Sequence, residues 1–272
     1  MANPQLYPLE VNSSTGEPFL RLRSHEQIII TPPRPEDVAL YSAIMNDPRI
    51  YEWLGSPPFP YTTEHAEEWY QKIKALSDGA LDNLEAARDT PDPILLDVCP
   101  IRNIRELKED GSDVFLGDIG IFRVTDGKFL IPHDEDINEE AKTKYKAVND
   151  ALPLGDPDIA WTVGCMWLQL SLQNLFLIVV DYIIPSYHSR GIMTDALQTL
   201  MWDWAVPRMG VRHIIASAFE GNTGSLRVFE KNGFVLSRFF ENHIQTREQW
   251  RNLHVVEWKL SSNGKFLKHT VE

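Results

Sequence analysis

The sequence predicts a mixed α/β fold in which short strands alternate with amphipathic helices. Two stretches carry this prediction. From Asp181 an apolar, β-branched segment runs to Pro185, and Gly191 then opens a helical pattern. A second strand, residues 211–219, leads into a helix with Asn222 as its N-cap. In the first stretch, a tight polar loop brings backbone N–H groups and the positive end of a helix to one point, which is typical of an anion site.

Composition limits the classes of function. The 272 residues, 43% of them apolar, suffice for one large domain or two small ones. The formal net charge of −13 argues against a general nucleic-acid binder. The two cysteines give no disulfide framework, and no signal-peptide pattern opens the chain, so we expect a reducing, cytoplasmic location. The longest apolar stretch, 165–180, is short and too polar for a membrane span, and we expect no membrane partner.

The first elements follow from local signals. Residues 1–25 are rich in Pro, Ser, Asn and Gly, so we expect a flexible N-terminal arm. The β-branched run 27–31 predicts a strand. Pro35 and two following acids start a helix whose apolar stripe ends near Asn46. Residues 51–61 form a loop with three prolines and several aromatic rings.

The middle of the chain mixes strands with expected insertions. Thr62 or Thr63 caps a helix whose apolar stripe includes Trp69, Ile73 and Leu76. Strands are expected at 94–104, 114–124 and 159–164, with a turn at 108–112, and insertions near 78–93 and 125–158. The second insertion includes a short exposed helix over 139–149 and an acidic run after His133. Because such runs are typical of solvated loops, we expect no metal there.

Residues 165–180 interrupt a strand. Their removal joins residues 159–164 directly to 181–184 and restores one continuous apolar segment. We hypothesise that 165–180 is an insertion within that strand, either an extra turn or helix or sequence that the functional protein lacks. Two further strands, 234–239 and 254–260, follow the Asn222 helix, and 261–272 forms a polar C-terminal tail.

Two motifs carry a family resemblance. The segment His188-Ser-Arg-Gly-Ile-Met-Thr194 resembles the acetyl-CoA loop of the GNAT acetyltransferase superfamily, and the surrounding pattern is similar to its RimJ/RimL-like branch. Asn222-x-x-Ser225, followed by Phe229-Glu-Lys-Asn-Gly-Phe, resembles the late motif of the same superfamily. The resemblance implies a single GNAT domain over 26–260, with helices flanking a mixed, mostly antiparallel sheet whose strands splay at the acetyl-CoA site. It also implies that the aromatic loop 51–61 walls the acceptor pocket.

The resemblance implies acetyl-CoA as cosubstrate. Loop amides would grip its pyrophosphate, and a strand backbone would pair with its pantetheine arm like an added strand. The residues expected against acetyl-CoA are Tyr182, Ile183, Ile184, His188, Ser189, Arg190, Gly191, Ile192, Met193, Thr194, Asn222, Ser225 and Lys231.

Acetyl transfer to an amine needs a proton acceptor, an oxyanion donor and an acid for the leaving thiolate. Many GNAT enzymes use a Tyr as this acid, but Phe229 stands at that position here and cannot donate a proton. The resemblance therefore favours Ser225 near the thiol, positioned by Asn222. Asp181, Glu220 or water could act as base, and we select Asp181.

The sequence thus predicts an acetyl-CoA-dependent N-acetyltransferase that acts by direct attack in a ternary complex. The acceptor is a protein N-terminus or a small-molecule amine, and the protein is a monomer or homodimer. The alternative is a non-catalytic CoA-binding module, because His188, Met193 and Phe229 depart from the family pattern. A hydrolase using Ser189 or Ser225 would lack the Gly-x-Ser-x-Gly elbow.

Overall fold

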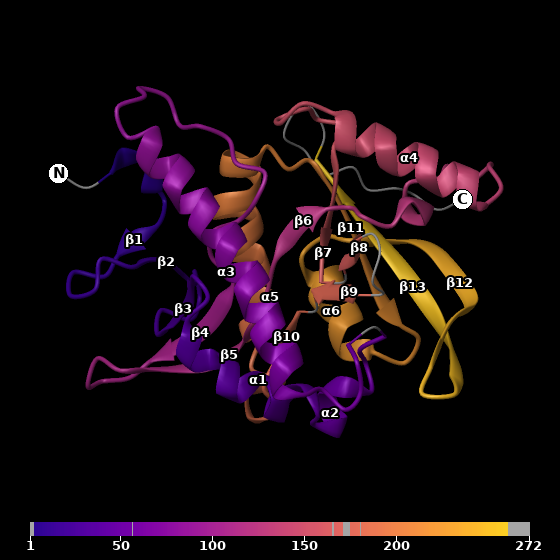
Figure 1. Cartoon of the computed structure of the whole chain (residues 1–272), viewed down its shortest axis with the longest axis horizontal. Helices are drawn as coiled ribbons and strands as arrows, with labels where there is room; N and C mark the ends of the chain where they lie inside the picture. The colour runs from indigo at the N-terminus through magenta and orange to yellow at the C-terminus, as the bar shows by residue number, and fades with distance from the viewer. Residues whose placement is uncertain (1–2, 56, 165, 171–174, 180, 261–272) are drawn as a thin grey trace.

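Most of the described strands form two adjoining sheets in the computed structural model, which describes residues 3–55, 57–164, 166–170, 175–179 and 181–260 (Figure 1). The first has the order β1 (Glu10–Val11), β2 (Pro18–Arg21), β3 (Ile28–Thr31), β4 (Asn103–Leu107), β5 (Asp113–Asp118), β10 (Tyr182–Ile183) and is antiparallel throughout. The second has the order β12 (Val235–Thr246), β13 (Gln249–Lys259), β11 (His213–Phe219), β7 (Ala160–Val163), β6 (Ile121–Arg123). Only β11 and β7 run parallel among these described pairs, which confirms the predicted mixed, mostly antiparallel architecture.

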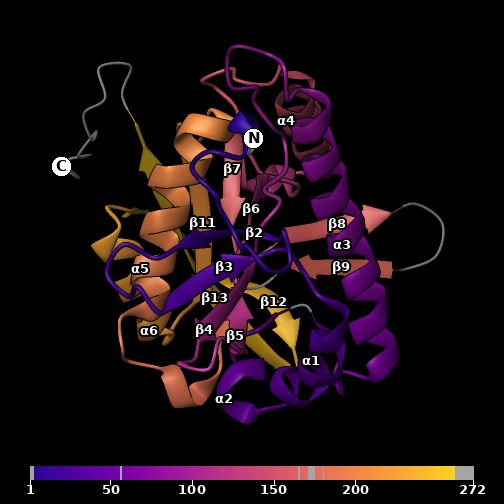
Figure 2. The same ribbon diagram turned by 90° about the vertical axis from the view of Figure 1, so that its left-hand side faces the viewer.

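Helices cover both faces of the first sheet. In Figures 1 and 2, α1 and α3 lie on one face and α5 on the other. The helical segments are η1 (Pro4–Leu6), η2 (Pro35–Asp37), α1 (Val38–Met45), α2 (Pro48–Tyr51), α3 (Thr63–Ala86), η3 (Gly127–Phe129), α4 (Glu139–Ala151), η4 (Pro185–Tyr187), α5 (Ile192–Thr199), the π-helical η5 (Leu200–Met209) and α6 (Thr223–Lys231). In the described part of the chain, no helix is long and apolar enough to cross a membrane.

The largest core cluster lies between the sheets and the helices. Trp161 of β7, Trp204 of η5 and Trp258 of β13 are fully buried in it, together with Leu84 of α3 and Ile104 of β4. Burial of such large apolar side chains is the dominant favourable term in folding. This core fixes the second half of the chain, from β7 to β13, against the first sheet.

The sheet opens between β10 and β11. β7 pairs with β11 through three residues, the last pair being Thr162 with Ile215. The chain then returns as β10, which pairs with β5. Among the described strands, residues 217–219 of β11 therefore have β13 on one side and no strand on the other. Two strand edges thus face each other across a gap, as the resemblance implied.

The N-terminal residues are packed rather than flexible. β2 pairs with β3, and Leu9, Leu20 and Leu22 are buried in the main core. The Asn3 side chain donates to the carbonyl of Leu84 at 3.0 Å. The expectation of a flexible arm over 1–25 is therefore wrong for the described residues. Composition misled because the few apolar side chains between the polar ones are those that reach the core.

Helix α3 is longer than expected. It begins at the Thr62 cap and continues to Ala86, through half of the insertion expected near 78–93. Ser77, Ala80 and Leu84 are buried, so a stripe of small and apolar residues continues at helical spacing. The strand expected at 94–104 begins only at Asn103 and continues to Leu107.

The region 125–158 is attached to β7 near its C-terminal end. The expected helix is present as α4. Near its C-terminus, the Asn149 side chain donates to the carbonyl of Ala160 at 3.1 Å and accepts from its N–H at 2.8 Å. This pair of hydrogen bonds ties α4 to β7, so its C-terminal end is not free as an exposed insertion would be.

Within 165–180, the described residues form β8 (Met166–Leu170) and β9 (Leu175–Val179), which pair antiparallel. They replace the turn or helix expected there, and the other residues of this segment lie outside those described. The two ends of the segment meet: a Cβ atom on Gly164 would lie 3.3 Å from Oδ2 of Asp181. That 165–180 interrupts a single strand remains our proposal.

Deleting residues 165–180 should leave the fold intact. Because the flanking residues already lie in contact, a shorter connection costs little loop entropy, and we expect the free energy of unfolding to stay within about 1 kcal/mol of the full chain. Urea denaturation followed by circular dichroism measures this difference. Loss of a cooperative transition in the deletion variant would show that the segment is needed for folding.

Candidate active site

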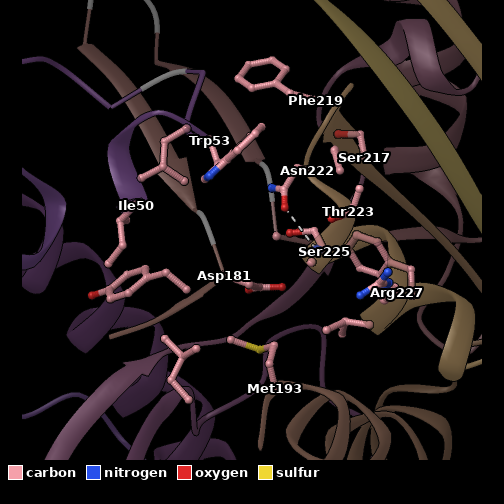
Figure 3. A pocket seen from close by; sticks show the side chains of 18 of the residues that line it. Ile50, Trp53, Asp181, Met193, Ser217, Phe219, Asn222, Thr223, Ser225 and Arg227 are labelled. Atoms are coloured by element: carbon pink, nitrogen blue, oxygen red, sulfur yellow. Dashed lines mark hydrogen bonds between the residues drawn. The ribbon is translucent and has the colours of Figure 1, made fainter. Parts of the chain in front are cut away.

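A cavity of about 600 Å³ lies where the sheet opens. One wall consists of Asp181 and the two residues of β10 that follow it. The other wall consists of residues 217–219 of β11. The N-termini of α5 and α6 also face the cavity, through Gly191–Thr194 and Asn222–Ser225. In Figure 3, Asp181 lies between Met193 below it and Trp53 and Phe219 above it. The cavity therefore has two ends with Asp181 between them.

The loop before α5 has the conformation that its sequence requires. Gly191 is the N-cap of α5 with φ of 80°, a left-handed conformation that glycine adopts without steric cost. Ser189 also has a positive φ, 61°. Two left-handed residues turn the chain sharply between η4 and α5, so the first N–H groups of the helix face the cavity, an arrangement suited to phosphate oxygens.

The backbone of β10 presents one residue to the cavity. The N–H of Ile184 donates to the carbonyl of Leu116 in β5 at 2.7 Å. Because N–H and carbonyl groups alternate sides along a strand, those of Ile183 point away from β5. His188 lies over this edge and donates from Nε2 to the carbonyl of Ile183 at 2.7 Å. The N–H of Ile183 is thus the β10 donor directed toward the gap.

The predicted contact residues fall into two groups. Tyr182, Ile183, His188, Ser189, Gly191, Ile192, Met193, Thr194, Asn222, Ser225 and Lys231 line the cavity. Ile184 and Arg190 are not among its lining residues. The N–H of Ile184 is engaged by β5, and the guanidinium of Arg190 lies 4.5 Å from the ring centre of Tyr187.

Helix α6 supplies the second half of the site. Asn222 Oδ1 accepts from the N–H of Ser225 at 3.1 Å, so the predicted cap is present (Figure 3). Ser225 lies between Asn222 and Asp181 in this view, while Arg227 and Lys231 line the cavity farther along the helix. Phe229 is buried in the core. The arrangement places a hydroxyl at the centre of the site and cations at one end.

Asp181 is the carboxylate of this cavity. Its Oδ1 accepts from the N–H of Gly120 at 3.1 Å, and Gly120 lies between the end of β5 and the start of β6. Burial raises the pKa of Asp181 well above its usual range, and the nearby Asp118 carboxylate adds to the rise, although the Gly120 N–H and Arg102 oppose it. A carboxyl with a raised pKa beside a cleft is suited to accept a proton near neutral pH.

His25 contacts the loop before α5, and the sequence did not predict this role. Its Nδ1 lies 2.8 Å from Asp195 Oδ2, and its Nε2 lies 3.1 Å from the carbonyl of Arg190. Asp195 Oδ2 also accepts from the N–H of Ser24 at 2.9 Å. These two contacts attach His25 to the start of α5, so a residue of the segment expected to be a loose arm supports the loop at Gly191.

The His25→Ala substitution should weaken anion binding at the loop. It removes a charge-assisted hydrogen bond and the contact that fixes the Arg190 carbonyl, and we expect the Kd for CoA to rise by a factor of about 5–20. Titration calorimetry measures this change. His133→Ala, outside the cavity, is the matched control, and equal affinities in the two variants would contradict the role assigned to His25.

Apart from the loop 51–61, the residues that line the other end of the cavity were not predicted from the sequence. It is lined by Arg49, Ile50, Trp53, Phe129, Ser217, Phe219, His243, Ile244 and Leu253. Ser217 and Phe219 had a local signal, since they end the strand that leads to Asn222. The residues of β12 and β13 had none, because the turn between these strands returns to the site from far along the chain.

Comparison with known proteins agrees with this geometry. Residues 140–235 match the sequence profile of the acetyltransferase (GNAT) domain. This part of the chain is therefore similar to a GNAT acetyltransferase domain. The matched residues include both α5 with its loop and the Asn222 motif. No curated protein sequence matches the chain.

Solved structures share the GNAT fold with this chain. The ribosomal-protein-S5-alanine acetyltransferase from Vibrio fischeri is 14% identical with a TM-score of 0.53, over 88% of this chain and 96% of that one. RimL, a ribosomal L7/L12 α-N-protein acetyltransferase in complex with coenzyme A, is 11% identical with a TM-score of 0.51 over the same shares. A probable acetyltransferase is 16% identical with a TM-score of 0.52, over 89% of this chain and 96% of that one. At these identities the likeness shows the fold alone.

Proposed function

We propose that this GNAT domain transfers the acetyl group of acetyl-CoA to a primary amine. The observation that carries the proposal is the gap between β10 and β11, with the amide-rich start of α5 at one end and Asp181 in the middle. Backbone N–H groups around Gly191, with Arg227 and Lys231, suit the phosphates of CoA. The RimL neighbour, crystallised with coenzyme A, supports this choice of donor.

Each side chain in the centre has a defined task in this reaction. Asp181 accepts a proton from the acceptor amine, whose nitrogen can then form the new C–N bond as the C–S bond of the thioester breaks. The N–H of Ile183 hydrogen-bonds the oxygen that gains negative charge. Ser225, positioned on α6 by the Asn222 cap, donates a proton to the leaving sulfur. Acetyl-CoA supplies the activated acyl group, and no covalent intermediate on the protein is required.

Turnover of acetyl-CoA with a panel of amines tests this proposal. We expect release of free thiol that depends on the amine and a product heavier by one acetyl group in mass spectrometry. Saturable acetyl-CoA binding without transfer to any amine would instead favour a non-catalytic CoA-binding module. That alternative is favoured by the absence of a tyrosine acid, since the buried Phe229 occupies the equivalent position.

A further inference from the structure

The end of the cavity opposite the α5 loop is apolar and aromatic. Trp53, Phe129, Phe219, Ile244 and Leu253 line it and belong to a single hydrophobic cluster. These residues come from four separate parts of the chain: the segment after α2, η3, the end of β11 and the β12–β13 hairpin. A wall assembled from several elements in this way is a built pocket, because no single element packs its apolar face there by default.

Close contacts hold the walls of this pocket in place. A Cβ atom on Gly55 would lie 2.8 Å from the ring of Phe219, and one on Gly221 would lie 3.7 Å from the ring of Trp53. Arg247, in the turn between β12 and β13, donates to the carbonyl of Leu54 at 3.1 Å. Its guanidinium also lies 4.9 Å from the ring centre of Tyr51. The hairpin therefore clamps the aromatic loop over the end of β11, so the pocket is preorganised for its ligand.

The charges around this pocket are unsuited to an acceptor with several amines. Among the described lining residues, Asp181 is the sole carboxylate. His243 accepts from Lys128, 2.7 Å away, and burial together with this cation lowers the pKa of His243 to about 4, so the imidazole is neutral. Arg49 at the rim is paired with Asp47, and Lys128 is paired with Asp126. A second ammonium group would therefore find no further carboxylate among the described lining residues.

From this distribution we infer that the acceptor is a primary monoamine carrying a bulky apolar group, preferably an aromatic ring, next to its amino group. The inference rests on the proposed acetyl transfer. The amine reaches Asp181, and the apolar group enters the pocket of Trp53 and Phe219. Both a free arylalkylamine and a peptide with an aromatic first residue carry this chemistry.

A competition among acceptors tests the inference with the full-length protein. The amines are 2-phenylethylamine, ethylamine, spermidine, and two peptides that differ only in a first residue of Phe or Ser. Because even one methylene in a hydrophobic pocket separates substrates by a factor of about 10–200, we expect kcat/KM for 2-phenylethylamine to exceed that for ethylamine and spermidine at least tenfold. The Phe-led peptide should exceed the Ser-led peptide by a similar factor. The faster of the two aromatic substrates identifies a free amine or a peptide N-terminus as the source.

Substitutions in the pocket distinguish a loss of acceptor specificity from a loss of folding or of acetyl-CoA binding. Trp53→Ala and Phe219→Ala should each reduce the advantage of 2-phenylethylamine over ethylamine at least fivefold, while the Kd for acetyl-CoA stays within twofold of the wild type. Trp250→Ala is the matched control, because this tryptophan is 59% exposed and lies outside the cavity lining. Preference for spermidine or the Ser-led peptide, or an unchanged preference in both pocket variants, would overturn the inference but not acetyl transfer. Absence of transfer to every amine would overturn both.

Discussion

Replacing Asp181 by Asn is expected to lower kcat for amine acetylation by a factor of about 10²–10⁴, the usual contribution of a general base. The amide keeps the size of the side chain and can still accept from the Gly120 N–H, so the site should stay assembled. Steady-state kinetics with a saturating amine measures the loss. Asp134→Asn, on the exposed loop before α4, is the control and should leave kcat unchanged.

The pH dependence of kcat is a second test of the role of Asp181. A base must be deprotonated to act, and the pKa of Asp181 is raised by burial and by Asp118. In the wild type, kcat should therefore fall on acidification at a pH above the ordinary aspartate pKa of about 3.9. The Asn variant should lack this limb. An Asn variant with wild-type kcat and an unchanged acid limb would remove Asp181 from the mechanism and favour Glu220 or water.

The same raised pKa has a consequence for stability. A carboxyl whose pKa is higher in the folded than in the unfolded protein favours the folded state below its unfolded pKa, and this contribution is lost as the pH rises through the folded value. Asp181 therefore destabilises the folded protein when it is ionised. We expect Asp181→Asn to raise the free energy of unfolding at neutral pH, as is common for residues kept for function.

The second large effect is expected at Gly117 of β5. A Cβ atom there would lie 2.0 Å from the carbonyl oxygen of Tyr182 and 2.9 Å from Cα of Ile183. Gly117→Ala must push β10 away from β5 and toward β11, which narrows the gap. We expect a loss of about 1–3 kcal/mol in the free energy of unfolding, typical of overpacking, and a rise in the Kd for acetyl-CoA of at least about tenfold.

A glycine in α3 offers a matched control. A Cβ atom on Gly79 would have no other heavy atom within 4 Å, beyond its own helix backbone and chain neighbours. Because alanine is favoured over glycine inside helices, Gly79→Ala should raise the free energy of unfolding by about 0.5–1 kcal/mol and leave the Kd unchanged. Urea denaturation and calorimetry measure both quantities. If Gly117→Ala is folded and binds acetyl-CoA as the wild type does, β10 is not the wall of the binding site.

Local signals were sufficient for the half of the site that lies on α5 and α6. Gly191 and Gly233 have positive φ where the sequence required a turn, and Asn222 caps α6. Each of these signals involves residues within a few positions of one another. A short stretch of sequence was therefore sufficient to predict these turns and this cap.

The remaining parts depend on contacts between distant residues. His25 reaches Asp195, and Arg247 reaches Leu54, across more than half of the chain. Neither pairing leaves a pattern in the local sequence, so the N-terminal segment was interpreted as loose and the hairpin was not assigned to the site. The acceptor pocket was not predicted for the same reason, because its walls meet only after the sheets and helices have assembled.

We expect acetyl-CoA to bind in the gap between β10 and β11. A calorimetric titration of the full-length protein with acetyl-CoA, alongside Gly117→Ala and Gly79→Ala, tests this placement directly. We expect saturable binding at one site, weakened by the first substitution and unaffected by the second. A cooperatively folded wild-type protein that shows no saturable binding would contradict it.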